Sequence, residues 1–149
     1  MRRDSRLSVA LHALLHMAQA ELLTSEEMAA QGETNPVVIR RTMAGLRAAG
    51  IVRSEKGHGG GWSLVRRLEA VTLYDVYEAL GEPTILAMGN RTESPGCIVE
   101  KAVNRALAGA FEAAGAVLVK ELRSITMAAL ARHIGPHHGI RRKKQVKHA

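Results

Sequence analysis

The sequence predicts a mainly α protein, and three observations support that fold class. Aromatic residues make up 3% of the 149 residues and hydrophobic residues 46%, so Leu, Val, Ile, Met and Ala must build the core, a composition that suits helices. Helix start signals recur along the first half of the chain. From residue 98 onward, a long stretch keeps an apolar stripe at helical spacing. The length suits one core with an appendage.

Two helices are expected before residue 32. Leucines at helical spacing over residues 5 to 20 predict the first. Thr24 stands three residues before Glu27, which is the spacing of a capping box, so a short helix should run from Ser25 to about Gln31.

A third helix follows after a tight turn at Gly32. Asn35 can accept hydrogen bonds from exposed first-turn amides, and Pro36 fits the first helical position because it has no amide proton to satisfy. This helix is predicted over residues 36-49, and Gly50 ends it.

A glycine-rich hairpin should come next. Residues 51 to 53 and 62 to 64 have strand character. We define the wing as residues 56-62, which include the connecting loop and the first residue of the second strand. Two helices joined by a short turn and followed by a hairpin form a winged helix-turn-helix, an arrangement that reads DNA. With a further capped helix opening at Thr72, we assign residues 1-82 to this domain.

The charge distribution agrees with a polyanionic partner. The formal charge is +7. Residues 1 to 67 hold ten Lys and Arg against six Asp and Glu, residues 68 to 134 hold six against eight, and residues 135-149 hold five against none. Positive charge therefore gathers on the predicted DNA-reading part and on the tail, which favours double-stranded DNA as partner. Solubility alone is the alternative explanation.

Arginines on helix 36-49 are the candidate readers. Ile39, Met43 and Leu46 repeat at helical spacing and should face the core, which leaves three arginines elsewhere on the helix. Near the amino end of a recognition helix, an Arg fork matches the paired acceptors of guanine. We therefore expect base reading by Arg40 or Arg41, with a phosphate contact or plain solvation as the alternative, and include Arg47 in the DNA-binding set.

The wing glycines do not form a nucleotide-binding loop. Trp62 and Ser63 follow the triple glycine, whereas a P-loop needs Lys and Ser or Thr there. A wing tip whose backbone approaches DNA explains the glycines better. The expected wing contacts are Lys56, His58, Gly59 and Gly60, and Trp62 is interpreted as the core anchor of the hairpin rather than a base stacker.

The long C-terminal helix is expected to make the protein a homodimer. Breakers across residues 83-97 predict a loop, and residues 98-134 a dimerisation helix followed by a short helix capped by Ser124 or Thr126. Packing back onto its own domain is the alternative use of the long helix. The basic tail, residues 135-149, should be disordered. The expected dimer contacts are Val103, Leu107, Ala110, Ala114, Val117 and Leu118.

Several site classes are not expected. No apolar run is expected to be long enough to span a bilayer, and the start of the chain lacks a signal-peptide pattern, so we expect a cytoplasmic protein that does not bind a membrane. His12 and His16 are four residues apart but have no further ligand nearby, so no metal site is predicted. Catalysis would need a histidine beside Cys97, and the loop offers none, so an enzyme is not expected.

The motifs SEEMAAQG, NPVVIRRTMAGLRAAGIVRS, GHGGGWSL and TLYDVYEALGEP resemble bacterial winged-helix transcriptional regulators of the IscR/NsrR type, the Rrf-two family, over about residues 5 to 132. The resemblance implies a homodimeric transcription factor, usually a repressor, whose long helices cross at the dimer interface and whose reading helices bind a palindromic operator. It places the front contacts of the reading helix at Val37, Arg40 and Arg41, and the wing-base contact at Lys56.

Cysteine content departs from the cluster-binding relatives. They carry three cysteines before the long helix, whereas this chain has only Cys97, so it resembles members that lack the iron–sulfur cysteine set. No cofactor is therefore expected. Cys97 is either a redox or effector-sensing thiol near a helix amino end or a small buried residue. A winged-helix protein-interaction module without sequence-specific DNA binding remains the alternative function.

Overall fold

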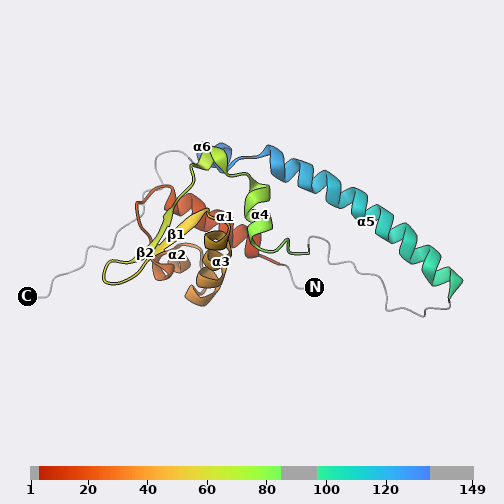
Figure 1. Ribbon diagram of the computed structural model, residues 1–149, viewed down its shortest axis with the longest axis horizontal. Coiled ribbons are helices and arrows are strands. Elements are labelled where there is room, and N and C mark those ends of the chain that lie inside the picture. The colour runs from red at the N-terminus through yellow and green to blue at the C-terminus, as the bar shows by residue number, and fades with distance from the viewer. Residues whose placement is uncertain (1–3, 85–96, 135–149) are drawn as a thin grey trace, which may run out of the picture.

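The computed structural model describes residues 4–84 and 97–134, and it confirms the mainly α fold class with a two-stranded wing and a long C-terminal helix (Figure 1). The predicted loop 83-97 lies almost entirely outside the described residues, and the predicted tail 135-149 lies wholly outside them. In chain order the elements are α1 (Arg6–Met17), α2 (Ser25–Gln31), α3 (Pro36–Ala48), β1 (Val52–Glu55), β2 (Gly61–Leu64), the 3-10 helix η1 (Leu68–Ala70), α4 (Leu73–Ala79), α5 (Ile98–Ser124) and α6 (Met127–Arg132).

Side-chain caps start the two helices of the motif, as their spacing predicts. The Thr24 hydroxyl accepts from the Glu27 amide at 3.1 Å, and the Glu27 carboxylate accepts from the Thr24 amide at 2.8 Å. Asn35 Oδ1 accepts from the Val37 amide at 2.7 Å and so caps α3. Helix α3 ends at Ala48, one residue before the predicted end.

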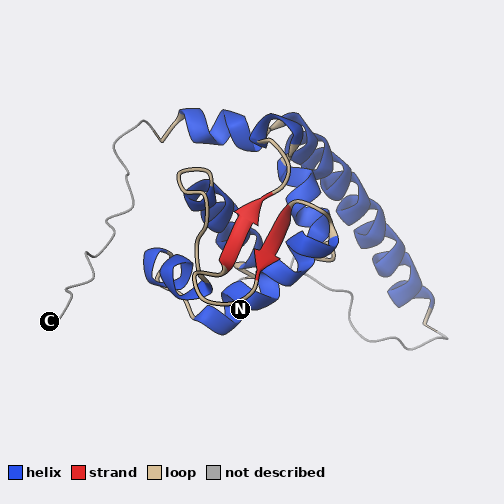
Figure 2. Ribbon diagram, turned by 60° about the vertical axis from the view of Figure 1, so that its left-hand side comes forward, coloured by secondary structure: helices blue, strands red, loops and turns tan. Residues whose placement is uncertain are grey.

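The wing is a short antiparallel hairpin (Figure 2). Its register pairs Val52 with Leu64 and Glu55 with Gly61. Strand β2 also pairs on its other side with the segment before α2, because the Leu23 amide donates to the Trp62 carbonyl at 3.0 Å and the Trp62 amide donates back at 2.8 Å. The wing is therefore tied to the helix-turn-helix through the backbone.

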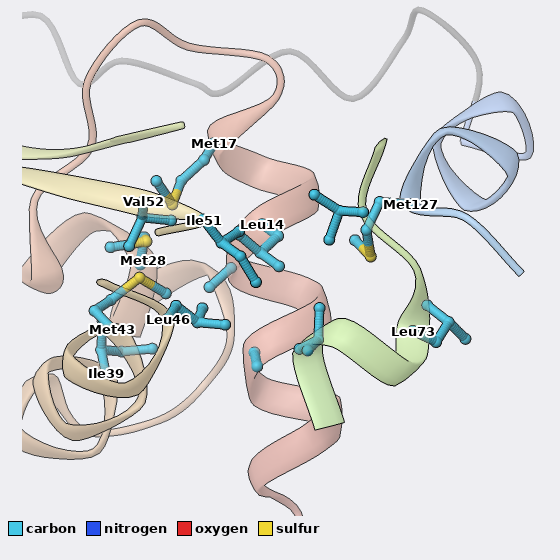
Figure 3. Packing of buried hydrophobic residues seen from close by; sticks show 14 of the residues in the cluster. Leu14, Met17, Met28, Ile39, Met43, Leu46, Ile51, Val52, Leu73 and Met127 are labelled. Carbon is cyan, nitrogen blue, oxygen red and sulfur yellow. The ribbon is translucent and has the colours of Figure 1, made fainter. Parts of the chain in front are cut away.

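One hydrophobic core joins all of these elements (Figure 3). Leu14 of α1 is fully buried at its centre, with Met28 of α2 and Met43 of α3 on one side and Met127 of α6 on the other. Sulfur-containing and aliphatic side chains dominate, as the scarcity of aromatic residues predicts. The buried apolar residues are Ala10, Ala13, Leu14, Met17, Leu23, Met28, Ala29, Ile39, Met43, Leu46, Ile51, Val52, Val71, Leu73, Val76, Tyr77, Leu122 and Met127.

Helix α4 supports α3 at close range. A Cβ atom added to Gly45 of α3 would lie 2.6 Å from the carbonyl oxygen of Ala79 in α4, a distance that real Cβ contacts do not reach. At the end of α4 the Tyr77 hydroxyl donates to the Pro83 carbonyl at 3.1 Å. Burial raises the pKa of Tyr77, with smaller contributions from Glu82 and Tyr74.

Among the described residues, helix α5 packs against the other elements near its carboxyl end and then extends away from them (Figures 1 and 2). The Leu73 amide donates to the Ile125 carbonyl at 2.9 Å, and the Met127 amide donates to the Val71 carbonyl at 2.8 Å, which fixes the α5–α6 junction beside α4. Leu122 is the buried residue of α5, and the Thr126 hydroxyl caps α6.

The expectation that no apolar run could span a bilayer needs correction at α5. By length and composition alone, α5 qualifies, and within the described ranges it is the one helix that does. Its apolar stretch nevertheless includes Arg105 and Glu112. A charged side chain at a bilayer centre costs about 2.5–3.5 kcal/mol on insertion scales, so these two charges argue against a membrane-spanning role for α5.

Candidate nucleic-acid interface

Helix α3 has one face in the core and one in water. Ile39, Met43 and Leu46 are at most 2% exposed and fix the rotation of the helix. That rotation leaves Val37, half exposed, and the two candidate reading arginines on the outer face. The predicted division of α3 into buried and outward side chains is therefore correct, and the outer face lies free for a partner.

The two arginines at the front of α3 differ in their surroundings. Arg40 Nη2 donates to Glu26 Oε1 of α2 at 2.5 Å, and both side chains stay more than half exposed. Arg41 is exposed and makes no ion pair or hydrogen bond with the part of the chain that the structure describes. Arg41 is thus fully available to a ligand, whereas one nitrogen of Arg40 is already bonded to a carboxylate.

Arg47 points toward the wing rather than toward the front of α3. It lies in the last turn of the helix, and its Nη1 donates to the Ser54 hydroxyl of β1 at 3.4 Å. Among the arginines predicted to contact DNA, Arg47 therefore stands apart from Arg40 and Arg41, between the helix and the hairpin.

The wing tip exposes its backbone, and the basic Lys56 and the ionisable His58 lie beside it. Lys56, His58 and Gly59 are exposed, and Gly59 has a φ of +78°, a conformation that favours glycine. Gly60 is half-buried in the turn, where an added Cβ would lie 2.3 Å from the Glu55 carbonyl oxygen. Glycine is therefore required at Gly60 by packing within the wing.

Trp62 anchors the wing, as predicted. Its ring packs against the hydrophobic core, and its Nε1 donates to the hydroxyl of Ser25, the first residue of α2, at 3.0 Å. Ser25 is itself 5% exposed. The side-chain bond adds to the backbone pairing with Leu23, so wing and α2 move together.

Sequence reasoning missed two charged residues at this surface. Arg53 of β1 is exposed, and its Nε donates to the Ser63 hydroxyl at 3.1 Å across the hairpin. Strand alternation could have placed Arg53 on the outer face of the wing. Glu26 has no local sequence signal, because its partner Arg40 lies fourteen residues away on another helix.

The expected dimer residues lie along α5 and are mostly uncovered. Val103 and Val117 are 49% and 63% exposed, and Leu107 is 38% exposed. Ala110 and Ala114 are exposed too. Leu118 differs from the others because it packs partly against the core of its own chain.

Cys97 stands at the amino end of α5 and is exposed. Burial as a small apolar residue therefore does not apply to it within the single chain. It is the one cysteine of the sequence, and within residues 4–84 and 97–134 no three His, Cys, Asp or Glu side chains gather as metal ligands. This donor set does not fit an iron–sulfur cluster, which prefers a nearly complete set of thiolates.

A helix-turn-helix with an anchored wing, an outward arginine-bearing helix and a projecting helical arm defines a winged-helix protein. The chain belongs to the Rrf2 family, described as iron-dependent transcriptional regulators, whose family model matches residues 3–133. The resemblance seen in the sequence motifs is therefore confirmed.

Individual relatives agree with this family. YwnA of Bacillus subtilis (strain 168), named as an HTH-type transcriptional regulator, is 33% identical over 131 residues, which cover 88% of this chain and 98% of YwnA. A crystal structure named as that of a DNA-binding protein is 32% identical, with a TM-score of 0.68, covering 85% of this chain and 98% of its own. T. potens IscR shares the fold at 20% identity and a TM-score of 0.62, covering 89% and 88%.

Proposed function

We propose that this chain is a homodimeric, sequence-specific regulator of transcription that binds a palindromic operator and represses transcription there. The proposed regulator works in the cytoplasm and carries no iron–sulfur cluster. The observation that carries the proposal is the outer face of α3, where Val37, Arg40 and Arg41 stand exposed beside an anchored wing. The family of transcriptional regulators and the DNA-binding name of a structural relative support it.

The reading role follows from the chemistry of α3 and the wing. The Arg41 guanidinium, which has no ion-pair partner in the described part of the chain, can donate two parallel hydrogen bonds to a guanine edge in the major groove. Lys56 and the exposed backbone of Gly59 at the wing tip can approach phosphates, and Gly60 supports that turn. Base reading by the helix and positioning by the wing are thus divided between two rigidly joined elements.

Dimerisation follows from the exposed apolar side chains of α5. Ile98 and Val99 are 84% and 71% exposed, and Val103, Leu107 and Val117 continue the apolar surface along the helix. Water contact with so many apolar side chains is unfavourable, and a second copy of the same helix covers them by symmetry. Two reading heads related by a two-fold axis then require a palindromic operator.

Selection of genomic fragments by the purified protein tests the proposal. The protein should enrich a palindromic sequence, and affinity should fall steeply with salt as phosphate contacts release counterions. Arg41→Ala should lower the preference for that sequence over random DNA by about tenfold. Arg132→Ala, which removes an equal charge from an exposed site on α6, should leave the preference unchanged.

Failure to enrich any sequence would instead favour the protein-interaction module. Anaerobic purification with a visible spectrum and iron analysis tests the cluster separately. We expect a colourless protein, because one thiolate per chain cannot complete a cluster. A coloured, iron-containing protein would contradict that part of the proposal and leave the DNA-binding part standing.

A further inference from the structure

Glu26 and Arg40 form the ion pair that links the two helices of the helix-turn-helix. Glu26 is the second residue of α2, Arg40 the fifth of α3, and Arg40 Nη2 lies 2.5 Å from Glu26 Oε1. Among the ion pairs given by the described residues, no other joins α2 to α3. The neighbouring Arg41 has no such acidic partner among residues 4–84 and 97–134.

Stabilisation of the fold does not explain why Glu26 and Arg40 are paired. Helix α2 is already capped by Thr24 and by the carboxylate of Glu27, so the Glu26 side chain is not needed to start it. Both members are more than half exposed, and exposed ion pairs contribute little to stability. The pair nevertheless stands on the face where the proposed DNA contacts lie, so its consequence should be sought in binding.

The Glu26–Arg40 ion pair changes which chemical groups of DNA Arg40 can bind. A phosphate attracts a free guanidinium strongly, but a carboxylate beside that guanidinium cancels its charge and repels the phosphate. A guanine edge carries no net charge and needs only hydrogen-bond donors. Glu26 accepts from one nitrogen of Arg40, and the remaining N–H groups of the fork stay available.

We propose that Glu26 is a specificity-determining residue, which positions Arg40 for base edges and weakens its binding to phosphates. The proposal rests on the DNA-binding function proposed above. On operator DNA the Arg40 fork donates to a base while Glu26 holds it in place. On random DNA no matching base is present, and the Glu26 carboxylate keeps Arg40 from making a phosphate contact instead. Nonspecific binding is therefore weakened more than operator binding.

The test compares two duplexes of equal length, the selected operator and a random sequence, by fluorescence anisotropy at one salt concentration. Glu26→Gln keeps the side-chain shape and removes the charge. It should tighten binding to random DNA and lower the ratio of operator to random affinity by about tenfold. Glu78→Gln on α4, an exposed carboxylate without an ion pair in the described structure, makes the same charge change and should alter both affinities equally.

A double-mutant cycle sharpens the result. In an Arg40→Ala background, Glu26→Gln should no longer change the affinity ratio, because the two residues act together. A ratio that Glu26→Gln leaves unchanged in the wild-type background, or a change that persists without Arg40, would overturn the role of Glu26 alone. A wild-type protein that selects no sequence would overturn the proposed function and this role together.

Discussion

The indole nitrogen of Trp62 donates a hydrogen bond to the hydroxyl of Ser25, 37 residues earlier in the chain, at 3.0 Å. This bond joins the second wing strand to the first turn of α2, the helix that precedes α3, the proposed recognition helix. Both partners are largely withdrawn from water, since Ser25 is 5% exposed and Trp62 is partly buried against the core. The position of the wing relative to α2 therefore depends on a polar side-chain contact as well as on the backbone pairing of Trp62 with Leu23.

Trp62→Phe should lower the free energy of unfolding by about 1–3 kcal/mol, because the buried Ser25 hydroxyl loses its donor and the smaller ring fills less space. Thermal denaturation followed by circular dichroism measures this loss. The double variant Trp62→Phe with Ser25→Ala is the control, since removing both polar partners should recover part of the loss. No recovery would show that the hydrogen bond contributes nothing beyond ring packing.

Gly45→Ala should destabilise the protein by about 1–3 kcal/mol, because its methyl group would collide with the Ala79 carbonyl and push α3 away from α4. Gly109→Ala in α5 is the matched control, as an added Cβ there meets nothing within 4 Å in the chain. Alanine favours a helix over glycine by about 1 kcal/mol, so Gly109→Ala should stabilise. Equal shifts in melting temperature for the two variants would contradict the close approach.

Glu33→Gly should stabilise the protein, which is the reverse of the usual effect of glycine. Glu33 lies in the turn between α2 and α3 with a φ of +49°, a left-handed conformation that costs a side-chain-bearing residue about 1 kcal/mol. Urea unfolding should show a gain of up to that size. Glu78→Gly, inside α4 with helical backbone, should lose about 1 kcal/mol instead. A loss in both variants would refute the strain at Glu33.

Val103→Asp should weaken the proposed dimer by about 100-fold, since a carboxylate would be buried among apolar side chains of α5 without a partner. Val103 is 49% exposed in the single chain, so its folding should be unaffected. Sedimentation over a dilution series measures the effect. Val65→Asp, at a 57% exposed site outside α5, should leave the dimer intact. Equal dissociation of both variants, or of neither, would argue against α5 as the interface.

The helix starts were predictable because capping is local. Thr24 with Glu27 and Thr72 with Asp75 each form a reciprocal cap three residues apart, and the spacing alone marks both. The outward position of Arg40 followed from the periodicity of the buried residues around it. Where a few neighbouring residues determine the structure, the sequence and the fold agree.

Contacts between distant segments could not be predicted. The Glu26–Arg40 pair, the Trp62–Ser25 bond and the pairing of Thr72 with Thr126 all join residues separated by ten or more positions. Their formation depends on how whole helices pack, and no local spacing encodes it. The exposure of Cys97 was likewise undecided by sequence, because a cysteine suits both buried and exposed sites.

The contact at Gly45 has a mechanical consequence. The backbone of Ala79 in α4 lies directly against Gly45, so α3 has little room to move relative to α4. Helix α4 is in turn hydrogen-bonded to the α5–α6 junction. Any displacement of α5 would thus move α3 together with α4 as a rigid body instead of bending α3. In the proposed dimer, affinity for DNA would then be set by the spacing between the two winged-helix domains, while the shape of each domain stays constant.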